Sequence, residues 1–568
     1  MRKKFFLIFL AIALVIALPF LFRRPGISLT QQTDDTVVIL TPHNESIRLE
    51  LELGFRDWYF QRTQRTVKID WRVPGSTNNC IRVMHTSFEN AFQQYWEQTL
   101  HRTWDATIQE GFRNPTPKNT AGKEAREAFL ASNISCGMDL FFGGGIVEFK
   151  KEAEIGHFVP CDLQKRHPEW FQENCIPATI DGDSMYDPQG RWYPTSLASF
   201  GMMYNTDRIR DLQIPAPQQW EDLTQPAFYH QIAMVDPVQS SVVVKCFEMI
   251  LQQQMQQVRK EILQKTGQTE CTPSERDQML NEGWLRGFRL IQKIMANARY
   301  FTDNSITTVW DVNQGNCAAG IVVDFYGRHQ RSVTRQRSGS DRIRFVLPKN
   351  GSCYSPDPIA LLRGAPNREV AQWFIEYVHS EEGQDRIGFR SIAETKQKPL
   401  SLPDDPTTRR LRSHQPRYYA LHRMPVRKDF YCDAKKPFQS SPDTNPFAKI
   451  NDFVFQPTWT APTFKAIRLL SKILFLDTYT ELSKAWKAIL DAKAAGRTQD
   501  AQRALALLEN FEDLSYSWVL KELNPLLQSG NVRAQMQLET TLIQRFYRQY
   551  RQAFQLANGK FLKKLRND

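Results

Sequence analysis

Short apolar runs alternate with amphipathic stretches through the first four hundred residues of the chain. Residues 37–40 and 232–235 are apolar runs of strand length, and residues 67–73 alternate apolar and polar side chains, which is typical of a strand with one buried face. Residues 46–59 place their apolar side chains on one helical face. A strand at 139–142 leads directly into three glycines. This β-α-β order predicts an α/β fold with a mostly parallel sheet.

One stretch in the middle of this region predicts how the fold is divided. The sequence SFGMMYNTD at 199–207 predicts a buried strand. The Asn-Thr-Asp that ends it is a good N-cap for a following helix. One set of α/β units precedes this strand and a second set follows it. We therefore expect the strand to join two lobes, with Gly201, Tyr204 and Asn205 at the hinge. A cleft between two lobes implies a bound ligand.

Ligands of open parallel sheets bind beyond the carboxyl ends of the strands, so the residues after each strand are candidate binding residues. These candidates are His43, Asn44, Gly143, Gly144, Gly145, Ser240, Ser241, Asp303, Asn304, Asp324, Tyr326 and Arg328. The three glycines either present backbone N–H groups to an anion or permit a tight turn. Ser240 either helps to hold an anion at a helix N-terminus or is an ordinary N-cap. Arg328 either binds an anionic group or pairs with Asp324.

Several segments together resemble the extracellular solute-binding proteins of bacterial ABC transporters. The segments are DLFFGGG, SFGMMYNTDRI, IPAPQQWEDLTQPAF, AMVDP, NCAAGIVVDFYGR and PDPIALLRGAPNREVAQWFIEYVHSEEGQ. The resemblance covers residues 36–395 and is to the group of ferric-iron and phosphosugar receptors, which have the type II periplasmic-binding fold. It implies a first lobe of residues 36–198 and 343–400 and a second lobe of residues 203–340. Residues 401–568 exceed what such a receptor needs.

The resemblance implies a receptor that traps a small solute between its lobes and presents it to the permease and ATPase subunits of an importer. Ferric-binding relatives use two tyrosines with a histidine and a glutamate. Here Phe325 precedes Tyr326, so the pair is absent. If the ligand is iron, we expect His43 and Tyr326 to bind it; otherwise His43 is a helix-capping residue or a residue of the rim. We therefore expect an organic anion or phosphorylated sugar ahead of ferric iron, and no resident cofactor. The alternative is a membrane-associated ligand sensor that uses the same cleft.

The sequence contains none of the enzyme signatures that we sought. There is no Ser-His-Asp order in a G-x-S-x-G setting and no HExxH motif, so we expect no enzymatic activity. The net charge is +12, with 41% hydrophobic and 24% charged residues, which indicates a globular protein. The sequence contains no stripe of Lys and Arg residues of the kind that would indicate nucleic-acid binding. The nine cysteines form no CxxC pair, and Cys161 with Cys175 would close the shortest disulfide loop.

The two ends of the chain predict a membrane anchor and a helical extension. Residues 5–22 carry no charge or amide, are flanked by cations, and approach the roughly 20 residues that span a bilayer. The run lacks a small-residue cleavage site, so residues 1–26 are expected to be an uncleaved inner-membrane helix ahead of a periplasmic chain, and a cleaved signal peptide is the alternative. Residues 401–568 are expected to pack on the second lobe as helices, one of them at 532–558. The basic stretch at 423–428 is expected at the surface.

Overall fold

The computed structural model of the chain describes residues 33–397, 400, 402–448 and 453–559. The expected anchor lies outside these residues. Within the described part of the chain, no helix has both the length and the apolar character needed to cross a bilayer.

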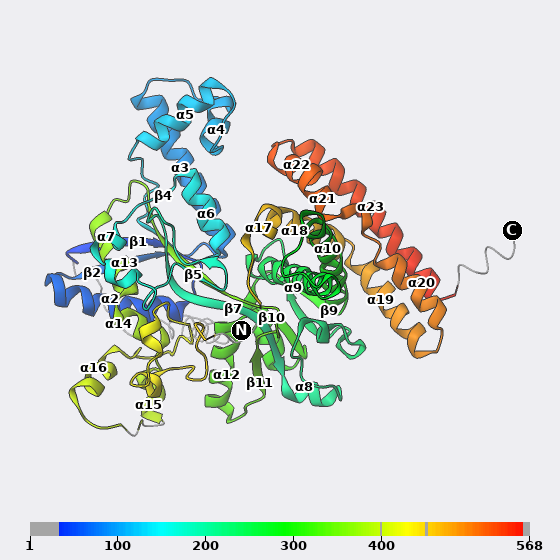
Figure 1. Cartoon of the computed structure of the whole chain (residues 1–568). Helices are drawn as coiled ribbons and strands as arrows, with labels where there is room; N and C mark the ends of the chain where they lie inside the picture. The colour runs from blue at the N-terminus through cyan, green and yellow to red at the C-terminus, as the bar shows by residue number, and fades with distance from the viewer. Residues whose placement is uncertain (1–32, 398–399, 401, 449–452, 560–568) are drawn as a thin grey trace, which may run out of the picture.

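The main sheet has ten strands and extends through both halves of the molecule (Figure 1). Its strand order is β2-β1-β3-β12-β7-β10-β8-β9, with β11 paired to β7 and β4 paired to β12. The strands are β1 (Asp35–Leu40), β2 (Val67–Arg72), β3 (Leu140–Phe142), β4 (Phe158–Val159), β7 (Tyr193–Asn205), β8 (Ile232–Val235), β9 (Ala298–Thr302), β10 (Ala319–Val323), β11 (Ile343–Val346) and β12 (Tyr354–Leu362). A separate hairpin joins β5 (Thr179–Ile180) to β6 (Asp183–Ser184). The predicted α/β class is confirmed, but the expectation of a mostly parallel sheet is wrong. Strand β12 pairs antiparallel with β3, β4 and β7, and β7 pairs antiparallel with β10 and β11, because both long strands run against their neighbours where the chain passes between the lobes.

The first lobe is a sheet with helices on both faces. Its helices are α2 (Glu45–Thr63), α3 (Thr77–Gln94), α4 (Ala106–Arg113), α5 (Thr120–Ala131), α6 (Ile146–Ile155), α7 (Leu163–Arg166), α13 (Arg368–His379) and α14 (Glu381–Gly388). Ile39 of β1 packs with α2 and α13, whereas the next residue, Leu40, packs with α3 and α6. This alternation follows from the two-residue period of a strand. Helices α4 and α5 project from the top of this lobe (Figure 1).

Strand β7 belongs to both lobes. Residues Tyr193 to Ser199 pair with β12, and residues Phe200 to Tyr204 pair with β10. The expected hinge residues all lie in the second half of the strand. Gly201 is required there because a Cβ atom would lie 2.3 Å from the carbonyl oxygen of Val346. A continuous strand that belongs to both lobes gives them a common support.

The second lobe is built on β8, β9, β10 and β11. Its helices are α8 (Thr206–Asp211), α9 (Ser241–Thr266), α10 (Pro273–Ala296), α11 (Ser305–Gln314) and α12 (Asp324–Ser338). Strand β11 pairs with Met202 to Asn205 of β7, and Ile343 packs with Met203 and Val322. The expectation that residues from 343 onward belong to the first lobe is therefore wrong at its start. Residue 343 stays in the second lobe because the Ile343 side chain completes an apolar cluster there. The chain returns to the first lobe only along β12.

The C-terminal part of the chain divides between the lobes, so the expectation that all of it packs on the second lobe is also wrong. Residues 402–447 contact the first lobe, although Thr444 also accepts a hydrogen bond from Arg328 of α12. There the buried carboxylate of Glu50 accepts the backbone N–H groups of Arg417 (2.7 Å), Tyr418 (2.6 Å) and Tyr419 (2.9 Å). This contact belongs to the first lobe because Glu50 lies on α2. The segment includes α16 (Pro406–His414) and follows α15 (Ile392–Gln397).

Residues 453–559 form a largely helical layer on α9 and α10, as Figure 1 shows. The helices are α17 (Pro457–Thr460), α18 (Phe464–Ser471), α19 (Tyr479–Ala494), α20 (Thr498–Leu508), α21 (Tyr516–Trp518), α22 (Asn524–Gln528) and α23 (Val532–Ala557). Trp284 of α10 donates to the carbonyl of Leu514 (2.9 Å), and Gln292 donates to the hydroxyl of buried Tyr550 (3.1 Å). The predicted long final helix is confirmed. It completes the core of the second lobe.

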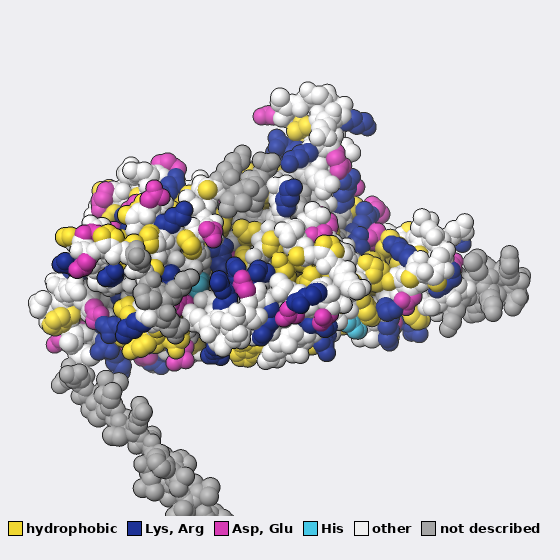
Figure 2. Space-filling model, turned by 90° about the horizontal axis from the view of Figure 1, so that it is seen from below, with side chains coloured by type: hydrophobic (Ala, Val, Ile, Leu, Met, Phe, Trp, Pro, Cys, Tyr) yellow, Lys and Arg dark blue, Asp and Glu magenta, His cyan; other side chains and the backbone are white. Residues whose placement is uncertain are grey.

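All nine cysteines are free, so no disulfide joins Cys161 to Cys175. Both side chains are buried, and burial raises the pKa of each thiol to about 11. On the face shown in Figure 2, Lys and Arg side chains are interspersed with acidic and apolar ones.

Candidate functional site

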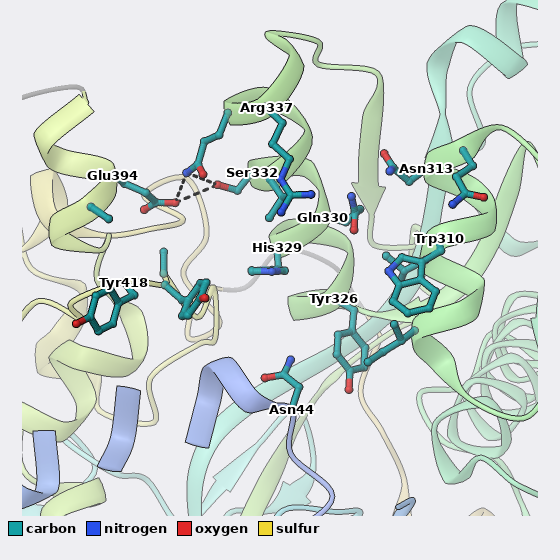
Figure 3. Close-up of a pocket in the computed structure, with 18 residues that line it drawn as sticks. Asn44, Trp310, Asn313, Tyr326, His329, Gln330, Ser332, Arg337, Glu394 and Tyr418 are labelled. Carbon is teal, nitrogen blue, oxygen red and sulfur yellow. Dashed lines mark hydrogen bonds between the residues drawn. The ribbon is translucent and has the colours of Figure 1, made fainter. Parts of the chain in front are cut away.

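A pocket of 570 Å³ lies between the two lobes (Figure 3). One wall consists of α11 and α12 of the second lobe. The opposite wall consists of Asn44 at the start of α2, residues 393–394 of α15 and residues 418–420. Asn44 caps α2 by accepting the N–H of Ile47 (3.1 Å), which fixes its position on the rim.

The pocket is lined mostly by uncharged polar and aromatic side chains. The amides and the hydroxyl are Asn44, Asn313, Gln314, Gln330, Gln336 and Ser332, and the rings are Trp310, Tyr326, His329, Tyr418 and Tyr419. Amides donate and accept hydrogen bonds, and aromatic rings offer flat apolar faces. Both suit a small hydroxylated solute. Trp310 is 55% exposed, so its ring is available to a solute.

Two charged groups also line the pocket, and they differ in how they are engaged. The carboxylate of Glu394 accepts from Gln336 (2.7 Å) and from Ser332 (3.2 Å), which ties α15 to α12 across the rim. Arg337 is exposed at the same rim. Burial lowers the pKa of His329, so its ring is neutral at pH 7. Arg337 is therefore the cation that this pocket offers to an anionic solute.

His43 lies next to the pocket in a buried network rather than on its surface. Its Nε2 atom is 3.0 Å from Asp357 and 2.8 Å from Arg423, and its Nδ1 atom is 3.1 Å from the hydroxyl of Thr41. Arg423 also forms a buried ion pair with Asp357 and lies over the ring of Phe325, 4.7 Å from its centre. Both ring nitrogens of His43 thus have protein partners. A guanidinium occupies the space between His43 and α12.

The electrostatics of this network follow from its burial. Burial alone would raise the pKa of Asp357, but the guanidinium of Arg423 and the hydrogen bond from His43 hold that pKa well below its ordinary value. Burial lowers the pKa of His43 more than Asp357 raises it, so His43 is neutral. The network is therefore a carboxylate-guanidinium pair with a neutral imidazole beside it.

The three glycines form a tight turn whose first two N–H groups point to the protein itself. Gly143 donates to the carbonyl of Pro358 (2.8 Å), and Gly144 donates to Asp357 (2.8 Å). The φ angles of +93° at Gly143 and +144° at Gly144 favour glycine, and a Cβ at Gly143 would lie 2.4 Å from the His43 ring. Gly145 begins α6 without a side-chain cap. The turn is thus the interpretation that fits the first two glycines.

Ser240 and Ser241 begin α9 and face the first lobe. The hydroxyl of Ser241 donates to Glu148 of α6 (2.7 Å) and accepts from Arg468 (3.1 Å). Ser240 occupies the N-cap position but makes no side-chain capping bond. Ser241 therefore takes part in a contact between the lobes, and neither serine is among the pocket residues.

The remaining predicted residues have structural partners. Arg328 lies 3.7 Å from Asp324 and donates to Thr444 (3.0 Å), which matches the salt-bridge alternative. Asp324 is buried and accepts from Ser199 (3.0 Å), and burial raises its pKa. Asn304 caps α11 and donates to its neighbour Asp303 (2.7 Å). Of the predicted set, Asn44 and Tyr326 line the pocket.

Sequence reasoning missed Arg423, Asp357 and most of the pocket lining. The expectation that the basic stretch at 423–428 lies at the surface is wrong, since Arg423 is 3% exposed and Val426 is fully buried. It is wrong because a buried carboxylate far away in the sequence compensates the charge of Arg423. Asp357 did carry a signal. It stands between two prolines inside a buried strand, where all three residues are unusual.

Residues 134–391 match the model of a family described as bacterial extracellular solute-binding protein. This segment contains β7, β12 and the sheet of the second lobe, together with the pocket walls α11 and α12. This segment, called the solute-binding domain below, is similar to that family. The resemblance noted in the sequence is thus confirmed. The solute-binding family consists of binding proteins, which agrees with the expectation of a receptor rather than an enzyme.

Two curated proteins align with part of this chain. An uncharacterized protein of Haemophilus influenzae is 23% identical over 255 residues, covering 44% of this chain and 60% of that protein. The phosphoglycerate transport regulatory protein PgtC of Salmonella typhimurium is 22% identical over 229 residues, covering 40% of this chain and 48% of that protein. The chain therefore spans about half the length of the curated relatives that its solute-binding domain matches.

Two solved structures are similar in fold to this chain. The periplasmic binding protein AfuA from Actinobacillus pleuropneumoniae, with fructose-6-phosphate bound, is 15% identical with a TM-score of 0.46, covering 78% of this chain and 98% of that one. Iron-bound HitA from Pseudomonas aeruginosa is 14% identical with a TM-score of 0.41, and the match covers 76% of this chain and 98% of HitA. The roles of the residues in this chain are argued from its own contacts.

Proposed function

We propose that the chain is the solute-binding receptor of an ABC importer and that its solute is a small phosphorylated organic anion, such as a sugar phosphate. The observation that carries this proposal is the 570 Å³ pocket between the lobes, whose walls combine amides, aromatic rings and the exposed guanidinium of Arg337. A pocket of this size suits a small solute. A solute that contacts both walls favours the closed form, which the permease then recognises. The receptor works outside the cytoplasm.

The chemistry of the pocket favours an organic anion over ferric iron. Ferric iron is a hard cation that binds anionic oxygen, and carboxylate and phenolate are the side chains that supply it. The carboxylate of Glu394 is engaged by Gln336 and Ser332, and burial raises the pKa of Tyr326, which keeps its phenol protonated. Arg423 already places a cation beside His43. A phosphate group, by contrast, would find the guanidinium of Arg337.

The name of one relative points to the same class of solute. PgtC of Salmonella typhimurium is named for phosphoglycerate transport, and phosphoglycerate is a small phosphorylated anion. We extend the chemical class, and not that particular solute, to this chain.

Calorimetry with matched ligands tests the proposal. The full chain is titrated with fructose-6-phosphate, phosphoglycerate, fructose and ferric citrate. The Arg337→Gln variant removes the cation of the pocket, and Arg335→Gln removes an exposed cation from the same helix outside the pocket. A charged hydrogen bond contributes about 1.5–3 kcal/mol, so Arg337→Gln should weaken phosphate-ester binding roughly tenfold to hundredfold while Arg335→Gln leaves it unchanged. Binding of ferric citrate alone, or equal effects of the two variants, would refute the proposal.

A ligand sensor with the same cleft would bind the same solute, and PgtC is named as a regulatory protein of phosphoglycerate transport. The two functions differ in what the cell loses. Deleting the gene abolishes uptake of the radiolabelled solute when the protein is a receptor. If the protein is a sensor, uptake survives once the transporter genes are expressed from an independent promoter.

A further inference from the structure

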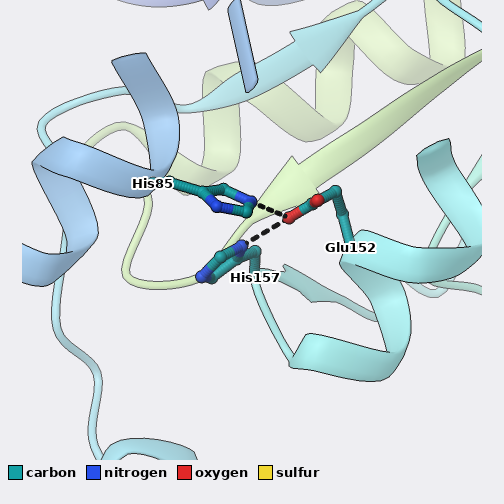
Figure 4. A group of neighbouring side chains, drawn as sticks. All are labelled: His85, Glu152 and His157. Atoms are coloured by element: carbon teal, nitrogen blue, oxygen red, sulfur yellow. Dashed lines mark hydrogen bonds and ion pairs between the residues drawn. The ribbon is translucent and has the colours of Figure 1, made fainter. Parts of the chain in front are cut away.

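Two histidines and a glutamate meet inside the first lobe, away from the interlobe pocket (Figure 4). His85 comes from α3, Glu152 from the last turns of α6, and His157 from the residues just after α6. Both imidazoles point at one carboxylate oxygen, Oε2 of Glu152. The distances are 2.8 Å from Nε2 of His85 and 2.6 Å from Nδ1 of His157. The second oxygen, Oε1, is buried and has no hydrogen-bond partner among the residues that the structure describes.

The surroundings hold these side chains in place and leave one side accessible. Glu152 is fully buried, and the ring of His157 stacks on Phe88 with 4.6 Å between ring centres. The side chain of His85 is 36% exposed, so solvent reaches the group from that side. The nearby guanidinium of Arg126 donates to the backbone carbonyls of Glu154 and Ile155. An ion could therefore enter past His85 without disturbing the aromatic core.

The three side chains are of the types that bind metal ions, and they are gathered closely enough to share one. Their ligand atoms all lie within 4.8 Å of one another. Metal ions bind carboxylate and neutral imidazole. A buried anionic oxygen without a partner is otherwise costly, and a cation would remove that cost.

We propose that His85, Glu152 and His157 form a binding site for one divalent transition-metal ion, with zinc as the best match. Two imidazoles and one carboxylate are ligands that suit zinc, and the exposed side at His85 leaves room for water as a fourth ligand. Ligands of tetrahedral zinc lie about 3.3 Å apart, so the ion needs the imidazoles to move back by roughly 0.6 Å. His85 can make this movement because it lies at the surface of α3. The ion would tie α3 to α6.

This site is independent of the proposed transport function, and the full chain, without a histidine tag, serves to test it. The chain is stripped with a chelator and titrated with zinc by calorimetry and with Co²⁺ by visible absorbance. His85→Ala is the main variant, because a half-exposed residue can be removed without opening the core. Glu152→Gln keeps the shape of the carboxylate but removes its charge. His101→Asn is the control, since His101 is exposed and lies outside the group, and Asn tolerates its positive φ angle.

We expect one ion per chain, a rise in melting temperature on adding zinc, and d–d bands of cobalt bound by nitrogen and oxygen. His85→Ala should weaken zinc binding at least tenfold and remove the zinc-induced rise in melting temperature. His101→Asn should change neither the affinity nor the rise. Absence of stoichiometric binding would overturn the proposal, and so would binding that His85→Ala leaves intact. Charge-transfer bands from sulfur would assign the ion to the free cysteines instead and would also overturn it. If Glu152→Gln does not fold, the comparison of His85→Ala with His101→Asn still decides.

Discussion

Replacing Arg423 with methionine tests the buried network beside the pocket. Methionine has a similar length and no charge, so the change removes the partner of Asp357 without leaving a large cavity. Asp357 and Arg423 are 8% and 3% exposed, which places the pair in the interior. Removing one partner of a buried ion pair costs about 3–5 kcal/mol, because the remaining charge stays buried and uncompensated. For a lobe of this size that corresponds to a fall in melting temperature of roughly 6–20 °C.

The effect has a pH dependence whose sign follows from the pKa of Asp357. In the native chain this pKa is depressed, so the carboxylate contributes stability above its ordinary pKa and loses it as the pH falls through the lower, folded-state value. In Arg423→Met the depressing guanidinium is gone and burial raises the pKa instead. The loss of a neighbouring cation also makes His43 easier to protonate beside Asp357. The difference in stability between the two proteins should therefore narrow as the pH falls from 7.5 toward 5.

Differential scanning calorimetry of both proteins across this pH range measures the effect. Arg65→Met is the control, because Arg65 pairs with Asp35 at the surface, where its side chain is 55% exposed. An exposed pair contributes little, so this control should shift the transition far less. Equal shifts for the two variants, or a gap that widens toward acid pH, would refute the buried ion pair as the source of stability.

Two further predictions concern the joint between the lobes. Gly201→Ala should destabilise the chain by about 1–3 kcal/mol, because the new Cβ would lie 2.3 Å from the carbonyl oxygen of Val346. Thermal denaturation measures this loss, and an unchanged melting temperature would contradict the close approach. Glu148→Gln should weaken the contact with Ser241 and raise the fraction of open molecules, which small-angle scattering of the ligand-free chain detects as a larger radius of gyration. An unchanged radius would argue against a closing contact there.

The sequence predicted the parts of the fold that depend on local pattern. The strand at 37–40 and the hinge strand were readable because runs of apolar residues flanked by turns need burial on both faces. Strand β11, with its sequence IRFV, was placed in the wrong lobe, because four alternating residues carry no information about which neighbour they pair with. Asn44 and Tyr326 were predicted correctly as pocket residues because both follow the carboxyl end of a strand, where ligands of such sheets bind.

The missed residues share one physical cause. Arg423 is 66 residues from Asp357 and 380 from His43 along the chain, and its burial depends wholly on those partners. A basic stretch is ordinarily a solvated surface, so local pattern gave the wrong expectation. The same holds for the glycine turn, whose N–H groups meet β12 more than two hundred residues later. Such long-range compensation of polar groups becomes visible when the chain is folded.

The position of Arg423 also determines what lobe opening costs. Its ion pair with Asp357 and its contact with His43 lie on the first lobe, whereas Phe325 belongs to the second. Opening therefore leaves the buried charges paired and separates the guanidinium from one ring, at a cost of about 0.5–2 kcal/mol. The hydrogen bonds of Ser241, Glu394 and Arg328 across the lobes add similar small amounts. A closed form held by a few kcal/mol is one whose population a bound solute can control.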